Sequence, residues 1–332
     1  MQKITVLGGG SWGTAIAKML TEKGYDTILW MRNKENAKEI IDTRLNKKYL
    51  PNILLPKELK VSTDKNKSIR DRDLLIFAIP TQNIRSFLQE IKDDIAENQI
   101  VCNVAKGLEA STHKRISQIF KEELENVRFG TLSGPSHAEE VSKKMPTTVV
   151  AASEDSYVAE YIQEVCMCEY FRVYANLDLL GVEIGGALKN VIALGAGIAD
   201  GLGYGDNAKA AIINRGIVEI ARLGEVLGAK YSTFAGLSGI GDLIVTCASK
   251  HSRNRKAGYL IGTGLCREEA IKEVGMVVEG IQTAVAANGL AIDSNIEMPI
   301  CQEIYKVLFD NINAKNAVDN LMMRDKKYEV EI

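Results

Sequence analysis

Lys189 lies in an apolar, glycine-containing stretch, which makes it a candidate for acid–base chemistry. Residues 181–194 read GVEIGGALKNVIAL. The residues three and four positions from Lys189 on a helix are glycine, isoleucine and alanine, none of which can form a salt bridge with it. Loss of water around a lysine lowers its pKa and lets it carry a proton near neutral pH. The alternative is that the side chain extends past its apolar neighbours to reach solvent.

Two other ionisable residues stand where a ligand could reach them. Lys106 follows the strand predicted over residues 100–105, and a lysine at the carboxyl end of a parallel strand points toward the ligand crevice of an open sheet. Asp242 ends the segment GIGD, where it could orient a substrate hydroxyl or a lysine ammonium. The alternatives are an ordinary loop lysine and an aspartate that caps a helix beginning near Leu243.

Two polar segments are candidates for anion binding. Residues 249–256 read SKHSRNRK, and cations with Ser and Asn before a helical stretch can hold a phosphate, although most charged runs are simply solvated loops. Residues 133–140 read SGPSHAEE, in which the spacing of Ser136 and Glu139 predicts a capping box at a helix start. Free N–H groups at such a start could also contact a ligand. The neighbouring His137 is given no role, because a lone histidine is more often structural.

Residues 8–13, GGGSWG, match the G-x-G-x-x-G fingerprint of dinucleotide-binding sites. The match follows an apolar run at the start of the chain and precedes a helix predicted over residues 14–23 and a second strand, which is the context that the fingerprint requires. Gly8 would make the tight turn, Gly10 would admit backbone amides to a pyrophosphate, and Gly13 would let helix and strand approach. The alternative is a glycine-rich turn without a ligand.

The second predicted strand ends without an acidic residue. Residues 29–33 read LWMRN, whereas an Asp or Glu usually closes this strand and binds the ribose 2′-hydroxyl of NAD. Arg32 stands there instead, and a guanidinium suits a 2′-phosphate. We therefore expect NADP(H) to be accepted as well as NAD(H). An arginine that is merely solvated at the surface is the alternative.

The elements that must position these residues fall into two groups. Up to about residue 176, short β-rich runs alternate with helical stretches such as residues 83–96 and 156–165, which is typical of a mainly parallel sheet. Strands are predicted at residues 4–7, 27–30, 74–79, 100–105, 129–132, 147–152 and 170–174. Later in the chain only helices are predicted, at residues 182–199, 208–227, 267–274, 283–288 and 299–309. We therefore expect a dinucleotide-binding domain over residues 1–178 and a helical substrate domain over residues 179–332.

Composition limits the possible classes of protein. The 332 residues are 46% hydrophobic and 25% charged, which suits a soluble chain of about two domains. The net charge is −2, so the chain lacks the overall positive charge with which a protein attracts nucleic acid. No apolar run reaches the roughly 18 residues of a membrane span, so no stable membrane insertion is expected. Six cysteines without a C-x-x-C pair and three scattered histidines predict no metal site and a cytoplasmic protein with reduced thiols. The charged residues 323–332 are expected to be mobile.

Taken together, the motifs resemble those of the bacterial NAD(P)-dependent sn-glycerol-3-phosphate dehydrogenases over nearly the whole chain. The resemblance is carried by residues 8–14 (GGGSWGT), 104–107 (VAKG), 133–140 (SGPSHAEE), 181–190 (GVEIGGALKN), 201–208 (GLGYGDNA), 237–246 (LSGIGDLIVT), 251–254 (HSRN) and 275–280 (GMVVEG). Several long motifs in this order are far more specific than the glycine fingerprint. The resemblance implies an α/β Rossmann-type N-terminal domain and an all-α C-terminal domain of the 6-phosphogluconate dehydrogenase kind, with the active site between them.

The resemblance also implies an activity and a set of site residues. The activity is the interconversion of dihydroxyacetone phosphate and sn-glycerol 3-phosphate with NADP(H) or NAD(H), which supplies glycerol 3-phosphate for phospholipid synthesis. Lys189 matches the catalytic lysine, the proton acceptor in alcohol oxidation. The other substrate-contacting positions are Lys106, Gly134, Ser136, Asp242, Ser252, Arg253 and Asn254. The fingerprint glycines Gly8, Gly10 and Gly13 are joined at the cofactor by Ser11, Trp12, Arg32, Lys106, Ala138, Arg253, Val277 and Glu279. Some relatives carry an arginine at Asn33, so the strength of NADP preference stays open.

Two other functions stay open on the sequence. A two-domain dehydrogenase of the 3-hydroxyacid or 6-phosphogluconate kind shares the plan and a helical lysine, although the run Ser252-Arg253-Asn254 and the SGPSHAEE segment argue against it. A dinucleotide-sensing binding protein would need the glycine loop but not Lys106, Lys189 and Asp242 together. We expect a homodimer, because closed two-fold assemblies are the commonest.

Overall fold

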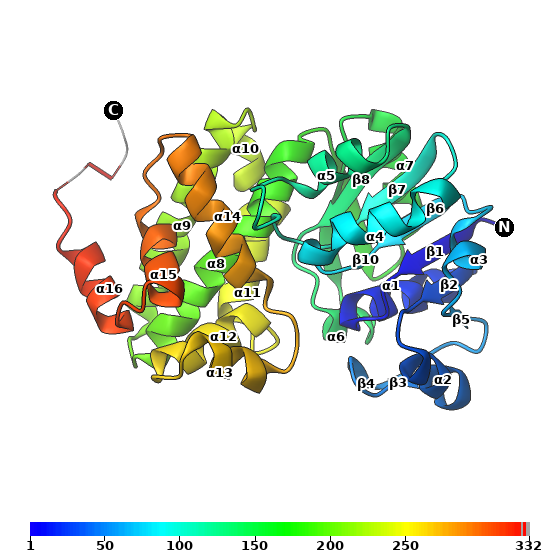
Figure 1. Ribbon diagram of the computed structural model, residues 1–332, viewed down its shortest axis with the longest axis horizontal. Coiled ribbons are helices and arrows are strands. Elements are labelled where there is room, and N and C mark those ends of the chain that lie inside the picture. Colours follow the sequence, from blue (N-terminus) through cyan, green and yellow to red (C-terminus); the bar gives the residue numbers. More distant parts are fainter. Residues whose placement is uncertain (327, 330–332) are drawn as a thin grey trace.

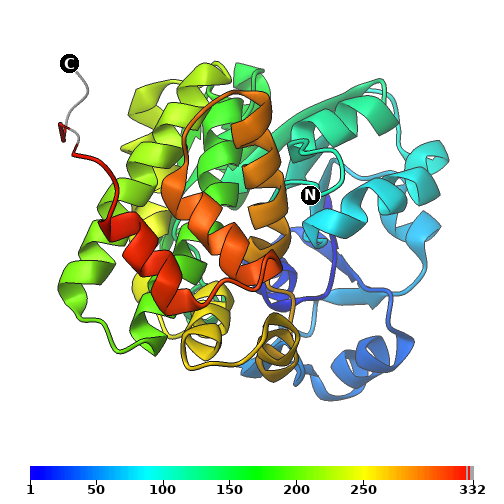
Figure 2. The same ribbon diagram turned by 60° about the vertical axis from the view of Figure 1, so that its left-hand side comes forward.

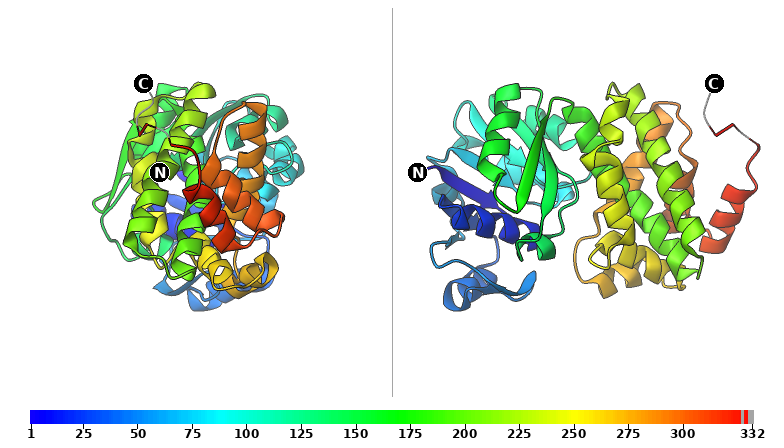
Figure 3. Two further views of the ribbon diagram at one scale, coloured as in Figure 1. Left: turned by 90° about the vertical axis from the view of Figure 1, so that its left-hand side faces the viewer. Right: turned by 180° about the vertical axis from the view of Figure 1, so that it is seen from behind.

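A sheet-containing half and a helical half lie side by side in the computed structural model of the chain (Figure 1). The structure describes residues 1–326 and 328–329. The prediction of a mobile charged end therefore falls partly on residues 327 and 330–332, which lie outside the described residues. The view from behind shows the same separation into two halves (Figure 3), and a view turned by 60° shows the C-terminal helices in front of the rest of the helical half (Figure 2).

The N-terminal half is built on an eight-stranded sheet with the order β10-β9-β8-β7-β6-β1-β2-β5. All neighbouring strands are parallel except β8 and β9, which confirms the prediction of a mainly parallel, Rossmann-type sheet. The strands are β1 (Lys3–Leu7), β2 (Asp26–Trp30), β5 (Lys60–Ser62), β6 (Leu74–Phe77), β7 (Gln99–Asn103), β8 (Val127–Ser133), β9 (Thr147–Ala152) and β10 (Phe171–Asn176). Every side chain of β6 is fully buried, as expected for an apolar strand covered on both faces.

Helices cover both faces of this sheet and carry its crossover connections. They are α1 (Ser11–Glu22), α2 (Lys34–Thr43), α3 (Lys65–Ile69), α4 (Ile84–Ile91), α5 (Ile116–Glu123), α6 (Ala138–Val141) and α7 (Ser156–Cys166). The single helix predicted over residues 83–96 is wrong in extent. It is α4 with a short 3-10 turn at each end, at Thr81–Asn83 and Lys92–Asp94.

A hairpin that the sequence did not predict lies between α2 and β5. Its strands are β3 (Leu45–Asn46) and β4 (Leu50–Leu54). The first has only two residues, and the second is interrupted by Pro51 and Asn52, residue types that are rare in strands. Asn46 fixes the hairpin to the glycine loop, because its side-chain amide donates to the carbonyl of Gly9 at 3.0 Å and to the hydroxyl of Thr14 at 2.8 Å. The hairpin therefore forms a wall beside the predicted dinucleotide site.

The second half is helical, as predicted, and in the described part of the chain no strand follows β10. Its helices are α8 (Leu179–Gly201), α9 (Asp206–Val226), α10 (Tyr231–Phe234), α11 (Asp242–Ala248), α12 (Arg253–Gly262), α13 (Arg267–Val274), α14 (Glu279–Asp293), α15 (Pro299–Phe309) and α16 (Ala314–Met322). Helix α8 runs through the centre of this half. It is long and apolar enough to cross a membrane, but nearly all of it is buried, so its composition is accounted for by its place in the core.

Glycines let α8 and α12 pack in direct backbone contact. A Cβ atom added to Gly258 of α12 would lie 2.1 Å from the carbonyl oxygen of Leu194, and one added to Gly197 of α8 would lie 2.1 Å from the carbonyl oxygen of Arg255. Real Cβ atoms do not approach backbone this closely, so the pair of helices requires glycine at these positions. The contact brings the start of α12 beside Lys189 and Asn190 of α8.

Gly258→Ala is expected to lower the free energy of unfolding by about 2 kcal/mol or more, because the methyl group forces the two helices apart. The midpoint of chemical denaturation measures this change. Gly205→Ala is the matched control, since a Cβ atom there meets nothing within 4 Å, and it should lower stability by about 1 kcal/mol or less. Equal midpoints for the two variants would contradict the proposed packing constraint.

Candidate active site

A cleft with a volume of about 490 Å³ lies between the two halves. On one side it is lined by the segments that follow β1, β2, β6, β7 and β8, and on the other by α8, α11 and the start of α12. Open α/β sheets bind ligands at the carboxyl ends of their strands, and the volume suits a small-molecule or cofactor site. The predicted site residues that line the cleft are Gly8, Gly10, Ser11, Trp12, Gly13, Arg32, Lys106, Ser136, Ala138, Lys189, Ser252, Arg253, Asn254, Val277 and Glu279.

The glycine loop has the form that a dinucleotide requires. Gly8 has a φ of +123°, and a Cβ atom at Gly13 would lie 2.0 Å from the carbonyl oxygen of Gly8, so helix and strand meet only because both residues are glycine. Nothing lies within 4 Å of a Cβ atom at Gly10, which leaves the loop backbone open. Helix α1 begins at Ser11, and the amide groups at its N-terminus suit a pyrophosphate. These residues fit a dinucleotide cofactor.

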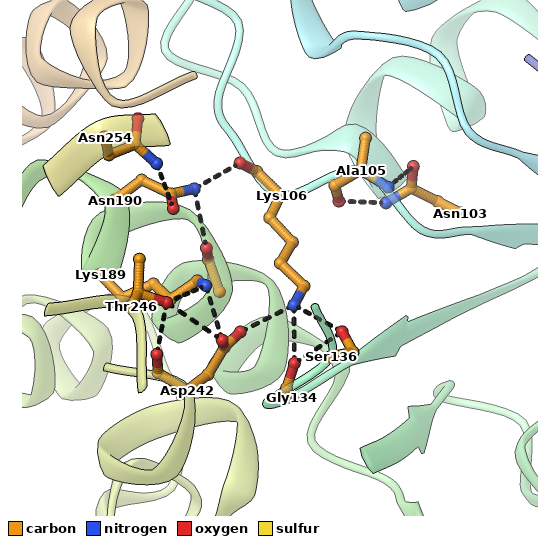
Figure 4. Close-up of polar contacts among 11 residues, drawn as sticks. Asn103, Ala105, Lys106, Gly134, Ser136, Lys189, Asn190, Asp242, Thr246 and Asn254 are labelled. Carbon is orange, nitrogen blue, oxygen red and sulfur yellow. Dashed lines mark hydrogen bonds and ion pairs between the residues drawn. The ribbon is translucent and has the colours of Figure 1, made fainter. Parts of the chain in front are cut away.

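Lys189 and Lys106 share one buried carboxylate (Figure 4). Lys189 Nζ donates to Asp242 Oδ1 at 2.6 Å and to the hydroxyl oxygen of Thr246 at 2.6 Å. Lys106 Nζ donates to Asp242 Oδ2 at 2.8 Å. Lys189 is therefore not a lysine that extends to solvent, and its partner comes from a different helix. Asp242 is the first residue of α11, where it orients two ammonium groups instead of capping the helix.

Lys106 also joins this cluster to the loop after β8. Its Nζ atom donates to the carbonyl oxygen of Gly134 at 2.7 Å and to the hydroxyl oxygen of Ser136 at 3.2 Å. Gly134 therefore contacts Lys106, and Asp242 contacts both lysines, although neither residue lines the cleft itself. The prediction that Ser136 caps a helix is wrong. Helix α6 begins one residue later, with His137 at the N-cap position, and the hydroxyl of Ser136 donates to Gly134.

The cluster sets the protonation of its members. Burial, with some help from the charge of Lys106, lowers the pKa of Lys189 to about 8, although Asp242 opposes the shift. Burial alone would raise the pKa of Asp242, but the ammonium groups of Lys106 and Lys189 outweigh it and hold that pKa below its usual value. The site therefore contains an ionised carboxylate and a lysine able to gain or lose a proton near neutral pH.

A chain of amides ties Lys106 to the helical half. The side-chain amide of Asn190 donates to the carbonyl oxygen of Lys106 at 2.9 Å, and that of Asn254 donates to Asn190 Oδ1 at 2.8 Å. The backbone N–H of Gly280 in turn donates to Asn254 Oδ1 at 2.9 Å. Asn254 thus lines the cleft while most of its amide is used inside the protein.

Several cleft residues were not singled out from the sequence. Asn190 follows Lys189 directly, and Thr246 lies one helical turn after Asp242 on α11, which is the signal that could have found them. His137 also lines the cleft, with its ring centroid 5.7 Å from that of His251 across the two halves. Burial, together with Lys189 and Lys106, lowers the pKa of His137, so its ring is neutral near pH 7.

Residues of the helical half form the side of the cleft that faces the sheet, and one of them contacts the N-terminal half directly. Ser252 caps α12 by accepting from the backbone N–H of Arg255 at 3.2 Å, and the exposed Arg253 donates to the carbonyl oxygen of Val277 at 3.0 Å. Glu279 accepts from the backbone N–H of Thr81 at 3.0 Å, and burial raises the pKa of Glu279. The start of α12, with its free amide groups and Arg253, is suited to a phosphate.

Arg32 lines the cleft in the loop that follows β2. Its side chain is 65% exposed, and Nη2 lies 3.5 Å from Glu90 Oε1. Arg32 is thus both solvated and part of the cleft wall, so the two alternatives drawn from the sequence do not exclude each other.

Family models, curated relatives and a crystal structure that match nearly the whole chain share one description. A model described as the N-terminus of NAD-dependent glycerol-3-phosphate dehydrogenase matches residues 3–159, and one described as its C-terminus matches residues 178–319. A glycerol-3-phosphate dehydrogenase of Fusobacterium nucleatum, named with NAD(P)+, is 52% identical over 333 aligned residues that cover 100% of this chain and 99% of the relative. A protein of the same name from Thermoanaerobacter sp. is 51% identical over 328 residues, 99% of each chain. A crystal structure of glycerol-3-phosphate dehydrogenase from Coxiella burnetii has a TM-score of 0.94 at 35% identity and covers 97% of this chain and 99% of that one.

Proposed function

The chain belongs to the NAD(P)-dependent glycerol-3-phosphate dehydrogenase family, and we propose that its cleft interconverts dihydroxyacetone phosphate and sn-glycerol 3-phosphate. The observation that carries this proposal is the buried cluster of Lys189, Asp242 and Lys106 beside the glycine loop. A binding protein has no need of a lysine with a lowered pKa and a fixed carboxylate next to its dinucleotide site.

The cofactor would be held by the glycine loop, the N-terminus of α1 and the residues after β2. When bound, it supplies or accepts the hydride at C2 of the substrate. Trp12 and Ala138 line the cleft on the side of the sheet, and Arg253 and Val277 line it on the side of the helical half. Arg32 is placed to pair with a 2′-phosphate, which supports the use of NADPH as well as NADH.

Lys189 is the group that handles the proton. In reduction, its ammonium form donates a proton to the oxygen on C2 as the carbonyl becomes an alcohol, and in oxidation its neutral form accepts that proton. A pKa of about 8 gives it both forms in useful amounts near neutral pH. Asp242 keeps the amine oriented through its 2.6 Å contact, and the positive charge of Lys106 stabilises the developing negative charge on the oxygen.

The substrate phosphate would lie at the start of α12. Ser252, Arg253 and Asn254 all line the cleft there, and the amide groups of the helix N-terminus add positive potential. Binding energy from the phosphate, which does not react, positions C2 against Lys189 and the nicotinamide.

The wider setting of the reaction follows from the same proposal. Residues 1–178 would form the cofactor domain and residues 179–332 the substrate domain, with catalysis at their contact. We place the enzyme in the cytoplasm as a homodimer, where reduction supplies glycerol 3-phosphate for glycerophospholipid synthesis.

A substrate panel tests the proposed function. With NADPH, dihydroxyacetone phosphate should be reduced, and unphosphorylated dihydroxyacetone should have a kcat/KM lower by at least about a hundredfold, because it cannot use the α12 site. In the oxidative direction with NADP+, sn-glycerol 3-phosphate should be oxidised in preference to 6-phosphogluconate or a 3-hydroxyacid. Preferred oxidation of either carboxylate would favour the rival two-domain dehydrogenases, and tight NADPH binding without turnover of any substrate would favour a dinucleotide sensor.

Arg32→Ala is expected to raise the KM for NADPH about tenfold, since it removes the cation that faces the 2′-phosphate. NADH has a hydroxyl at that position, so its KM should change little and serves as the internal control. Initial rates with each cofactor at saturating dihydroxyacetone phosphate measure both values. Equal losses with NADH and NADPH would show that Arg32 acts on the fold of the site and not on the 2′-phosphate.

A further inference from the structure

Glu90 of α4 lies between two cations at the edge of the cofactor site. Its Oε1 atom is 3.5 Å from Nη2 of Arg32, and its Oε2 atom accepts from Nζ of Lys65 at 2.8 Å. The three residues come from different segments, namely the loop after β2, helix α3 and helix α4. In the part of the chain that the structure describes, Glu90 is the carboxylate paired with Arg32.

The position of Glu90 follows from that of its helix. Phe87 lies one turn earlier on α4 and lines the cleft, as does Arg32. Glu90 therefore reaches the rim of the cleft from the same helix that forms part of its wall. No acidic residue ends β2 and Asn33 is neutral, so the negative charge near Arg32 is supplied from α4.

We propose that Glu90 sets the preference between NADPH and NADH, because its carboxylate competes with the 2′-phosphate of NADPH for Arg32. NADH has only a hydroxyl at that position and is unaffected by the competition. Glu90 thus lowers the advantage that Arg32 alone would give to NADPH. This inference rests on the proposed function only in placing the adenosine ribose beside Arg32.

The contact geometry indicates that Glu90 competes only weakly with a phosphate for Arg32. The contact between Arg32 and Glu90 is single and long, and the two side chains are 65% and 44% exposed, so a phosphate can displace the carboxylate. The shorter contact with Lys65 keeps Glu90 at the rim. The Lys65 hydrogen bond, with a further contribution from the charge of Arg32, also lowers the pKa of Glu90, so the carboxylate is ionised throughout the neutral range.

Glu90→Gln tests the proposal by direct binding. The chain has two tryptophans, Trp12 and Trp30, and both line the cleft, so quenching of their fluorescence reports the binding of NADPH or NADH without any substrate. We expect the Kd of NADPH to fall about threefold to fivefold, the range for an exposed ion pair, and the Kd of NADH to stay the same. The difference should shrink as salt is added.

Glu97→Gln is the matched control. Glu97 is an exposed glutamate just before β7, at the amino ends of the strands, whereas the cleft lies at their carboxyl ends. The same change of net charge at Glu97 should therefore leave both Kd values unaltered. In an Arg32→Ala background, Glu90→Gln should have no further effect on the Kd of NADPH.

Three outcomes would overturn the inference. They are equal changes for NADPH and NADH, an effect of Glu90→Gln that survives at full size without Arg32, and a failure of the unmodified protein to bind NADPH. Because no substrate is present, a protein that binds NADPH but does not reduce dihydroxyacetone phosphate would contradict the proposed reaction while leaving the role of Glu90 measurable.

Discussion

Lys189→Ala is expected to lower kcat for the reduction of dihydroxyacetone phosphate at least about a hundredfold while NADPH binding is retained. The variant removes the amine that donates the proton to the oxygen on C2, and it leaves the glycine loop and Arg32 in place. Steady-state rates measure kcat, and tryptophan fluorescence measures the Kd of NADPH. Lys209→Ala is the control, since Lys209 pairs with Asp200 elsewhere in the helical half and should keep normal turnover. Near-normal turnover in Lys189→Ala would remove Lys189 from the mechanism.

The pH dependence of the unmodified enzyme provides a second test of the same residue. Reduction needs the ammonium form of Lys189, so kcat should be constant at lower pH and decline as pH rises through about 8. Oxidation needs the neutral form, and its rate should rise over the same range. Both inflections should vanish in Lys189→Ala. An inflection near pH 8 that survives in the variant would assign it to another group.

Asp242→Asn is expected to lower kcat about a hundredfold and to change the pH profile of what remains. The variant removes the carboxylate shared by Lys189 and Lys106, so burial and the repulsion between the two ammonium groups are no longer opposed. Since Asp242 raises the pKa of Lys189, its loss should move the alkaline decline of the reduction rate to lower pH.

Two controls distinguish an effect of Asp242→Asn on the orientation of Lys189 from a loss of folding. Circular dichroism should show that the helical content of Asp242→Asn is unchanged, so that the loss is assigned to the site. Thr246→Val provides the comparison, because it removes one acceptor of Lys189 while keeping the carboxylate, and it should lower kcat without moving the inflection as far. A decline at the same pH as in the unmodified enzyme would show that Asp242 does not control the protonation of Lys189.

The parts of the fold that could be predicted are those with strong local patterns. The fully apolar run of β6 and the glycine fingerprint gave a strand and a dinucleotide loop from the sequence alone, and the periodicity of Arg267–Val274 and Pro299–Phe309 gave the bounds of α13 and α15. The β3–β4 hairpin could not be found in this way, because β3 has two residues, β4 contains Pro51 and Asn52, and the contact of Asn46 with the glycine loop is not a local pattern. Tertiary contact outweighs propensity in such segments.

The sequence predicted which residues belong to the candidate site better than it predicted which of them contact one another. Lys189 stood out because no helical neighbour could pair with it, but its partner Asp242 lies 53 residues away, and no local pattern shows that separation. The cap predicted for Ser136 failed because the helix starts one residue later, a shift that frees its hydroxyl for Lys106 and Gly134. His137 lies against His251 through the packing of the two halves, which the sequence does not encode locally.

The most direct measurement is the loss of near-ultraviolet absorbance of NADPH on addition of dihydroxyacetone phosphate, repeated with NADH. We predict rapid loss with both cofactors, with sn-glycerol 3-phosphate as the product. The ratio of the two rates reports how far the competition of Glu90 for Arg32 reduces the preference for NADPH. No loss with either cofactor, from folded protein that still binds NADPH, would contradict the assignment of the cleft to glycerol 3-phosphate chemistry.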